Sequence, residues 1–103
     1  MDYVKTEIKG KELRLEYLKE ELVFNTASFM LEYIEKMLHS TNAEKLVLNL
    51  INVNQIDSSA VGMFIALKYD LNKRKKKFKL AGLSENVRRT LSMLDIENFL
   101  GAA

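Results

Sequence analysis

The spacing of apolar residues changes several times along this chain, and those changes restrict the fold more than any other feature. Residues 11–18 (KELRLEYL) alternate apolar and polar side chains, which is typical of a half-buried strand. From Asn25 the apolar residues recur at every third or fourth position, the spacing of a helix. Residues 45–53 (KLVLNLINV) are apolar almost throughout, which predicts a central strand buried on both faces.

The N-terminal quarter of the chain predicts a β-hairpin followed by a helix. Residues 3–8 alternate more weakly than residues 11–18, and Gly10 stands between the two segments, where a turn is needed. Asn25 or Thr26 can cap the helix that follows, because a short polar side chain accepts from the free N–H groups of the first turn.

The remaining elements continue the alternation of strands and helices. We expect a helix over Ala60–Asn72, a strand over Phe78–Ala81, and a third helix capped by Ser84 with Val87, Leu91 and Leu94 on its buried face. The order β-β-α-β-α-β-α predicts one α/β domain over residues 1–103, with helices packed on a partly parallel, mixed sheet. In such sheets, ligands and partners meet the carboxyl ends of the strands, which is where residues 55–59 (QIDSS) fall.

Composition excludes several classes of function. The chain has no cysteine, and His39 is its one histidine, so neither a thiolate zinc site nor a multi-histidine metal site is available. We expect no metal and no cofactor. The N-terminus lacks the apolar core of a secretory signal, and no apolar run approaches the roughly 18 residues that span a bilayer. A cytoplasmic location without membrane insertion is therefore expected.

Asp57, Ser58 and Ser59 stand between two apolar runs, within residues 55–62 (QIDSSAVG). One interpretation is a helix cap, for which Asp and Ser are preferred residues. The other is a phosphorylation site, because a phosphate at a helix N-terminus is tolerated by the fold yet brings about −2 of charge to any docked surface. Serine hydrolysis is disfavoured, since His39 is expected to end the preceding helix and no G-x-S-x-G elbow is present.

Three further features suggest packing or solvation more than chemistry. Residues 73–77 (KRKKK) and Lys79 are typical of the solvated C-terminal end of a helix, and no aromatic platform accompanies them to favour nucleic acid. Gly62 costs the second helix about 1 kcal/mol relative to alanine, which suggests close packing on a neighbour. The methionines of the helices, Met93 among them, are expected in the core.

Together these residues resemble the STAS domain family, whose best-known members are bacterial anti-sigma-factor antagonists. The resemblance rests on residues 45–67 (KLVLNLINVNQIDSSAVGMFIAL) followed by residues 77–100 (KFKLAGLSENVRRTLSMLDIENFL), and on the order of the elements. It implies a binding protein and not an enzyme.

The resemblance also implies a mechanism. Family members bind an anti-sigma factor that is also a serine kinase, the kinase phosphorylates the serine after the aspartate, and a serine phosphatase reverses the modification. That serine is Ser58 here, with Ser59 as the less favoured choice. The partner surface implied by the resemblance comprises Phe24, Asn25, Thr26, Gln55, Asp57, Ser58, Ser59 and Val61.

The chain departs from the family pattern in three places. Ala60 replaces a common glycine, and residues 20–23 (EELV) replace a common G-E-L-D. We also expect the chain to lack the last strand and helix of longer members, which would leave an edge or face open to pairing with a second copy as a homodimer. Two alternatives stay open beside the antagonist: a STAS scaffold or accessory subunit of a transporter or signalling complex without a phosphorylation switch, and a small enzyme or nucleic-acid binder.

Overall fold

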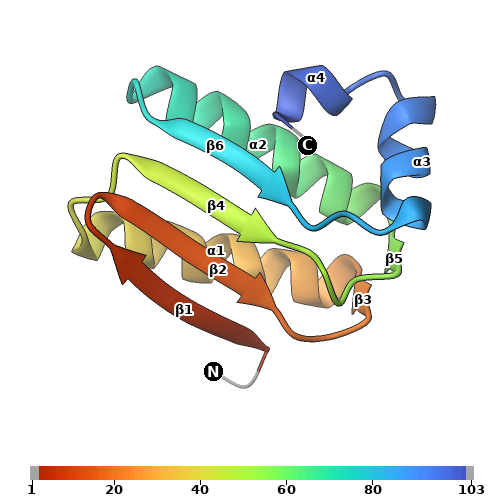
Figure 1. The fold of residues 1–103 in the computed structure, drawn as a ribbon, viewed down its shortest axis with the longest axis horizontal. Coiled ribbons are helices and arrows are strands. Elements are labelled where there is room, and N and C mark those ends of the chain that lie inside the picture. The colour runs from red at the N-terminus through yellow and green to blue at the C-terminus, as the bar shows by residue number, and fades with distance from the viewer. Residues whose placement is uncertain (1–2, 102–103) are drawn as a thin grey trace.

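Four strands form the main sheet, in the spatial order β1-β2-β4-β6 (Figure 1). They are β1 (Val4–Lys9), β2 (Glu12–Tyr17), β4 (Lys45–Asn49) and β6 (Lys77–Ala81). The structure is a computed structural model and describes residues 3–101. β1 and β2 are antiparallel and the other two pairs are parallel, which confirms the expected mixed sheet. The expected turn of the hairpin is confirmed too, with Gly10 at φ 62°.

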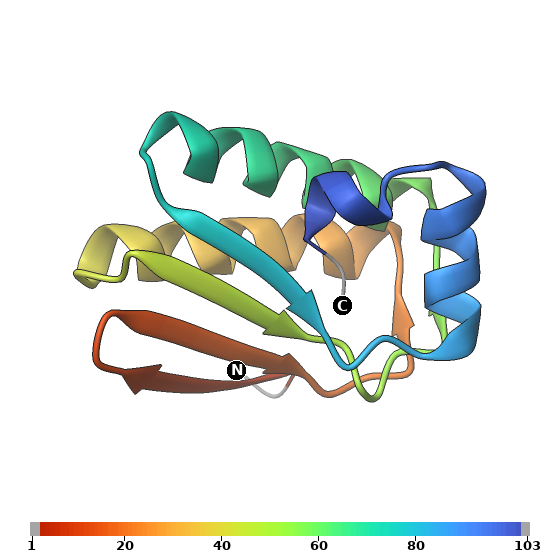
Figure 2. The same cartoon turned by 45° about the horizontal axis from the view of Figure 1, so that its top comes forward.

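Two long helices, α1 (Phe24–Ser40) and α2 (Ser58–Lys73), cover one face of this sheet (Figure 2). Leucine side chains from β2, β4 and β6 meet buried side chains of both helices in one core. The spacing at Ala27, Met30, Ile34 and Leu38 places these four residues on the buried face of α1, as the sequence predicts. The largest fully buried side chains include Tyr17, Phe64, Met30 and Ile34.

The expectation that residues 45–53 form a strand buried on both faces is wrong. β4 ends at Asn49, and Val47 is only half-buried on the face away from the helices. The reason is topological: β2, β4 and β6 follow one another in a single direction across the sheet, and right-handed crossovers then place α1 and α2 on the same side. The other face stays open and is lined mainly by polar side chains such as Arg14, whose Nε donates to Glu12 at 2.6 Å.

Two short helices follow β6, α3 (Glu85–Met93) and α4 (Glu97–Leu100). Ser84 caps α3 as expected, because its Oγ accepts from the backbone N–H of Val87 at 3.2 Å. Leu94 lies beyond the helix end and is half-exposed, and Met93 is 80% exposed, so the expectation that both are buried is wrong. Helix α4 was not expected; it contacts α2 and β6, and buries Leu100.

The structure contains two strands of two residues each that the sequence did not predict, β3 (Glu21–Leu22) and β5 (Gln55–Ile56). They pair in parallel as a second, separate sheet, with Glu21 opposite Gln55 and Leu22 opposite Ile56. Each one directly precedes a long helix, β3 before α1 and β5 before α2. The small sheet therefore holds the N-termini of the two long helices side by side.

Candidate functional site

Asp57 joins the N-termini of both long helices. Its Oδ1 accepts from the backbone N–H groups of Ser59 at 3.0 Å and Ala60 at 3.1 Å, which are the second and third residues of α2. Its Oδ2 accepts from the backbone N–H of Phe24, the first residue of α1, at 3.1 Å. One carboxylate thus satisfies free donors of two helices and lies at the positive end of both helix dipoles.

The expectation that Asn25 or Thr26 caps α1 is wrong. The helix begins at Phe24, and its N-cap is Val23, which has no polar side chain to offer. Thr26 acts from the third helical position, where its Oγ1 accepts from the Val23 N–H at 3.0 Å and donates to the Val23 carbonyl at 2.9 Å. The capping carboxylate comes instead from Asp57, 33 residues along the chain. Sequence spacing alone carries no signal for such a contact.

Ser58 and Ser59 differ in exposure. Ser58 is the first residue of α2 and is exposed, whereas Ser59 is half-buried. Because a modifying enzyme must reach the hydroxyl, exposure favours Ser58. Gly62, one turn further along α2, is exposed as well, and a Cβ built on it meets nothing within 4 Å. The expectation that Gly62 allows close packing within the domain is therefore wrong.

The other predicted contact residues fall around this junction. Phe24 is 67% exposed, so its side chain is not packed into the core. Asn25 and Gln55 are also exposed, the first in α1 and the second in β5. Thr26 and Val61 are half-buried, and Val61 packs against the core. The small sheet of β3 and β5 brings these two segments of the chain together.

The neighbouring loops contribute one large exposed side chain that sequence analysis did not single out. Ile51 is 59% exposed in the turn after β4. A Cβ built on Gly82 would lie 3.2 Å from Ile51 Cβ, so this turn runs directly beside the loop after β6. Ile51 thus adds apolar surface at the carboxyl ends of the parallel strands, where partners of open sheets bind.

The one histidine of the chain lies far from Ser58. His39 lies in the last turn of α1, and Asp57 binds the first turn, so the histidine is roughly 22 Å of helix away at 1.5 Å per residue. Among residues 3–101, no group of three His, Cys, Asp or Glu side chains could hold a metal ion. In the same range, no helix is long and apolar enough to cross a bilayer.

The basic segment forms the end of α2 and the turn into β6. Lys73 ends the helix, Arg74 pairs with Asp70 one turn earlier at 3.3 Å, and Lys75 adopts a positive φ of 58° in the turn. Lys76 is tied down, because its Nζ donates to the Ala43 carbonyl at 2.6 Å. This placement agrees with the interpretation as a helix end, where cations complement the dipole.

The fold and the site define a small α/β domain in which a carboxylate caps helix α2 and an exposed serine is the first residue of that helix. The model of the STAS domain family matches residues 5–101 of the chain. The chain therefore belongs to the STAS domain family.

Solved structures share the fold at low sequence identity. TM1081 of Thermotoga maritima, a proposed anti-sigma factor antagonist, is 22% identical with a TM-score of 0.88; the match covers 96% of this chain and 84% of that one. The anti-sigma factor antagonist SpoIIAA in its unphosphorylated form is 18% identical with a TM-score of 0.78, over 97% of this chain and 87% of that one. A sulfate transporter family protein of Wolinella succinogenes is 18% identical with a TM-score of 0.77, over 92% of this chain and 75% of that one.

Proposed function

We propose that this protein is an anti-sigma-factor antagonist that is switched by phosphorylation of Ser58. It binds an anti-sigma factor that is also a serine kinase and so releases the sigma factor. The observation that carries the proposal is the exposed Ser58 hydroxyl at the first position of α2, directly after the Asp57 carboxylate that ties α2 to the start of α1. The structural likeness to SpoIIAA, a protein solved in phosphorylated and unphosphorylated forms, supports it.

The charge at this site explains how a phosphate would act. A phosphate on Ser58 adds about −2 of charge beside Asp57, on a surface where Phe24 and Gln55 are exposed for contact. The dipole of α2 tolerates that charge in the free protein. A docked partner would have to desolvate it, which costs several kcal/mol without a matching cation. The modification therefore blocks rebinding without unfolding the domain, and a serine phosphatase restores binding.

Intact-mass measurement tests whether Ser58 is the modified residue. The protein is incubated with ATP and each anti-sigma kinase of the source genome, and the expected product carries one phosphate. Ser58→Ala should abolish the product, and Ser59→Ala, the matched control on the half-buried neighbour, should leave it intact. The absence of a phosphorylated product with every kinase, or its persistence in Ser58→Ala, would refute the switch.

A binding measurement tests the electrostatic mechanism separately. Ser58→Asp adds a charge, and Ser58→Asn adds a side chain of the same size without one. We expect Ser58→Asp to weaken binding to the anti-sigma factor at least ten-fold more than Ser58→Asn does. Equal losses in both variants would mean that shape and not charge controls the contact.

The second candidate is a STAS scaffold or accessory subunit without a phosphorylation switch. The likeness to the transporter family protein of Wolinella succinogenes favours it, since the shared fold extends over most of this chain. In that case the same surface binds its partner constitutively. Affinity purification of the tagged protein from its own cells distinguishes the two, because a kinase is recovered in the first case and a transporter or signalling complex in the second.

A further inference from the structure

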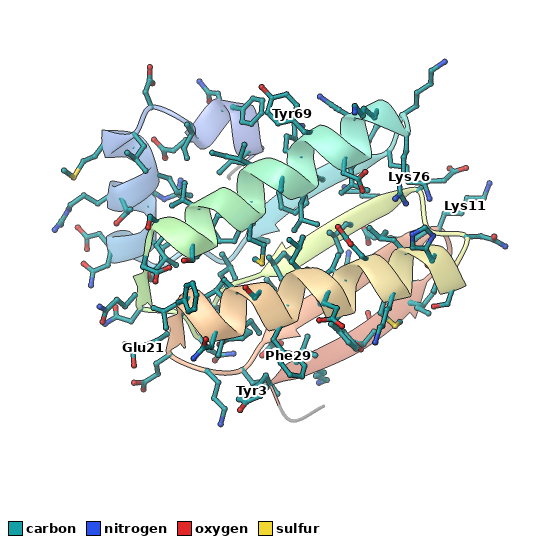
Figure 3. All side chains as sticks on the ribbon, turned by 180° about the vertical axis from the view of Figure 1, so that it is seen from behind. Tyr3, Lys11, Glu21, Phe29, Tyr69 and Lys76 are labelled. Atoms are coloured by element: carbon teal, nitrogen blue, oxygen red, sulfur yellow. The ribbon has the colours of Figure 1, made fainter. Side chains whose placement is uncertain are left out.

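Among residues 3–101, strand β1 forms one edge of the main sheet, and exposed apolar side chains border it. Ile8, in β1 itself, is 55% exposed, and Tyr3, just before the strand, is 37% exposed. Phe29 of α1 is 55% exposed and its ring stands edge-on to that of Tyr3, with the centroids 6.3 Å apart (Figure 3). Apolar surface of this extent beside an open strand edge favours a protein partner over water.

The backbone of β1 offers its free hydrogen-bonding groups at alternate residues. The Tyr3 carbonyl accepts from the Leu18 N–H at 2.7 Å, so Tyr3 turns its backbone groups toward β2. In an antiparallel ladder this direction alternates from residue to residue. Val4, Thr6 and Ile8 therefore direct their N–H and C=O groups outward, where another strand can bind them.

The sequence of β1 is complementary to itself in one antiparallel register. When two copies pair about a two-fold axis at Thr6, Val4 lies opposite Ile8 of the second copy, and Lys5 lies opposite Glu7. Apolar side chains then meet on the helix-covered face, and two ion pairs form on the open face. The outward backbone groups of all three even-numbered residues are matched in this register.

The neighbouring two-fold registers are disfavoured by charge. An axis at Glu7 would place Glu7 against its own copy and Lys5 against Lys9, and an axis at Lys5 would place two Lys5 side chains together. An axis at Ile8 would place Glu7 opposite Lys9, but it would set Thr6 against the turn residue Gly10. The axis at Thr6 is therefore the one that matches all three outward residues within β1 and also pairs opposite charges.

The opposite edge of the sheet, β6, lacks this complementarity. Lys77 and Lys79 share its open face, so an antiparallel pairing of β6 about Phe78 or Lys79 brings lysines against lysines. The end of α4 also approaches this edge, because a Cβ built on Gly101 would lie 3.1 Å from the Phe78 carbonyl oxygen. Of the two edges of the main sheet, β1 is the one suited to a second copy.

We infer that the protein forms a two-fold symmetric homodimer through β1, with the axis at Thr6, so that two four-stranded sheets join into one of eight strands. In this dimer Ile8 of the second copy lies next to Val4 and reaches the exposed Tyr3 and Phe29 rings. β1 and β6 are opposite edges of the sheet, and α2 packs on the side of β6 (Figure 1). Both Ser58 hydroxyls therefore stay accessible, and the dimer presents two switch sites.

Sedimentation equilibrium on charge variants tests the register. We expect a concentration-dependent dimer for the natural protein. Lys5→Glu turns both intermolecular ion pairs into repulsions, which should raise the dimer dissociation constant about thirty-fold. The double exchange Lys5→Glu with Glu7→Lys should return the constant to within about three-fold of the natural value.

The double exchange also separates the dimer from the folded monomer. Within one chain Lys5 faces Glu16 and Glu7 faces Arg14. The double exchange therefore places like charges together at both positions of the hairpin, whereas Lys5→Glu does so at only one. Across the dimer interface the order is reversed, because only the double exchange restores opposite charges. Thermal unfolding of both variants checks that each is folded. A protein that stays monomeric at millimolar concentration would overturn the inference, as would a dimer that Lys5→Glu leaves unchanged.

Amide hydrogen exchange gives a second, independent readout on the natural protein. Raising the concentration should slow exchange at the N–H groups of Val4, Thr6 and Ile8 and leave those of Lys5 and Glu7 unchanged, because only the first set points outward. Slowing at β6 in place of β1 would assign the interface to the other edge.

Discussion

The hydrogen bonds of Asp57 predict a larger loss of stability on removal of this side chain than an ordinary helix cap would give. Asp57→Ala removes the cap of α2, which is worth about 1 kcal/mol. It also removes the acceptor for the Phe24 N–H, and a hydrogen bond to a charged group at this solvent-exposed site adds about 1 kcal/mol more. The free energy of unfolding should therefore fall by about 2 kcal/mol, or roughly 8–16 °C in Tm.

Ser84→Ala is the matched control for this prediction. Ser84 caps α3 through one hydrogen bond, to the Val87 N–H, and reaches no second helix in doing so. Its removal should lower the free energy of unfolding by about 1 kcal/mol, with both variants measured by urea denaturation. The difference between the two variants, about 1 kcal/mol, measures what the bond to α1 adds.

A double-mutant cycle tests whether Asp57 contacts the start of α1. Phe24→Pro removes the N–H that Asp57 accepts from, and proline suits the first position of a helix. Val23 already has the extended backbone, φ −135° and ψ −178°, that a following proline requires. We expect a coupling free energy of at least about 1 kcal/mol between Asp57→Ala and Phe24→Pro, because proline removes the donor and its Cδ also crowds the Asp57 carboxylate. A coupling of zero, with equal losses in Asp57→Ala and Ser84→Ala, would refute the idea that one carboxylate holds both helices.

Two further predictions follow from glycine positions and from a buried phenol. Gly62→Ala should raise the free energy of unfolding by about 1 kcal/mol, because the site is helical, exposed and open. Gly82→Ala should lower it by about 2 kcal/mol, because φ is 66° and the new Cβ would overlap the Asn49 side chain. Urea denaturation of the two variants checks that the changes have opposite signs. Burial raises the pKa of Tyr17, whose hydroxyl donates to the Glu21 carbonyl at 2.8 Å, so the unfolded chain loses this proton first and stability should decline as the pH rises above about 10. Tyr17→Phe should lower the free energy of unfolding by about 1 kcal/mol at neutral pH, and that free energy should then fall less steeply as the pH rises. An unchanged slope of the free energy of unfolding against pH between about pH 9 and 11 would contradict the assignment to Tyr17.

Periodicity in the sequence determined most of the architecture. The two-residue alternation of the hairpin, the helical spacing at Ala27, Met30, Ile34 and Leu38, and the Ser84 cap are local signals, and the structure confirms each of them. The motif around Asp57 likewise indicated the start of α2, since a cap bonds only to the next few residues of its own chain. Such features are readable because their physical causes lie within one turn or one strand.

The tertiary structure alone decided the features that join distant segments. β3 and β5 are too short to show a period, and they form only because the intervening residues 23–54 fold back and place them together. The same return brings Asp57 to the Phe24 N–H, a contact that no local pattern encodes. The direction of the crossovers left one face of the sheet open, which an apolar run in the sequence cannot reveal. The sequence by itself thus determined the starts of α2 and α3 and the buried face of α1. The meeting of two helix N-termini at one carboxylate depended instead on long-range pairing, whose free energy comes from contacts between residues far apart in the chain.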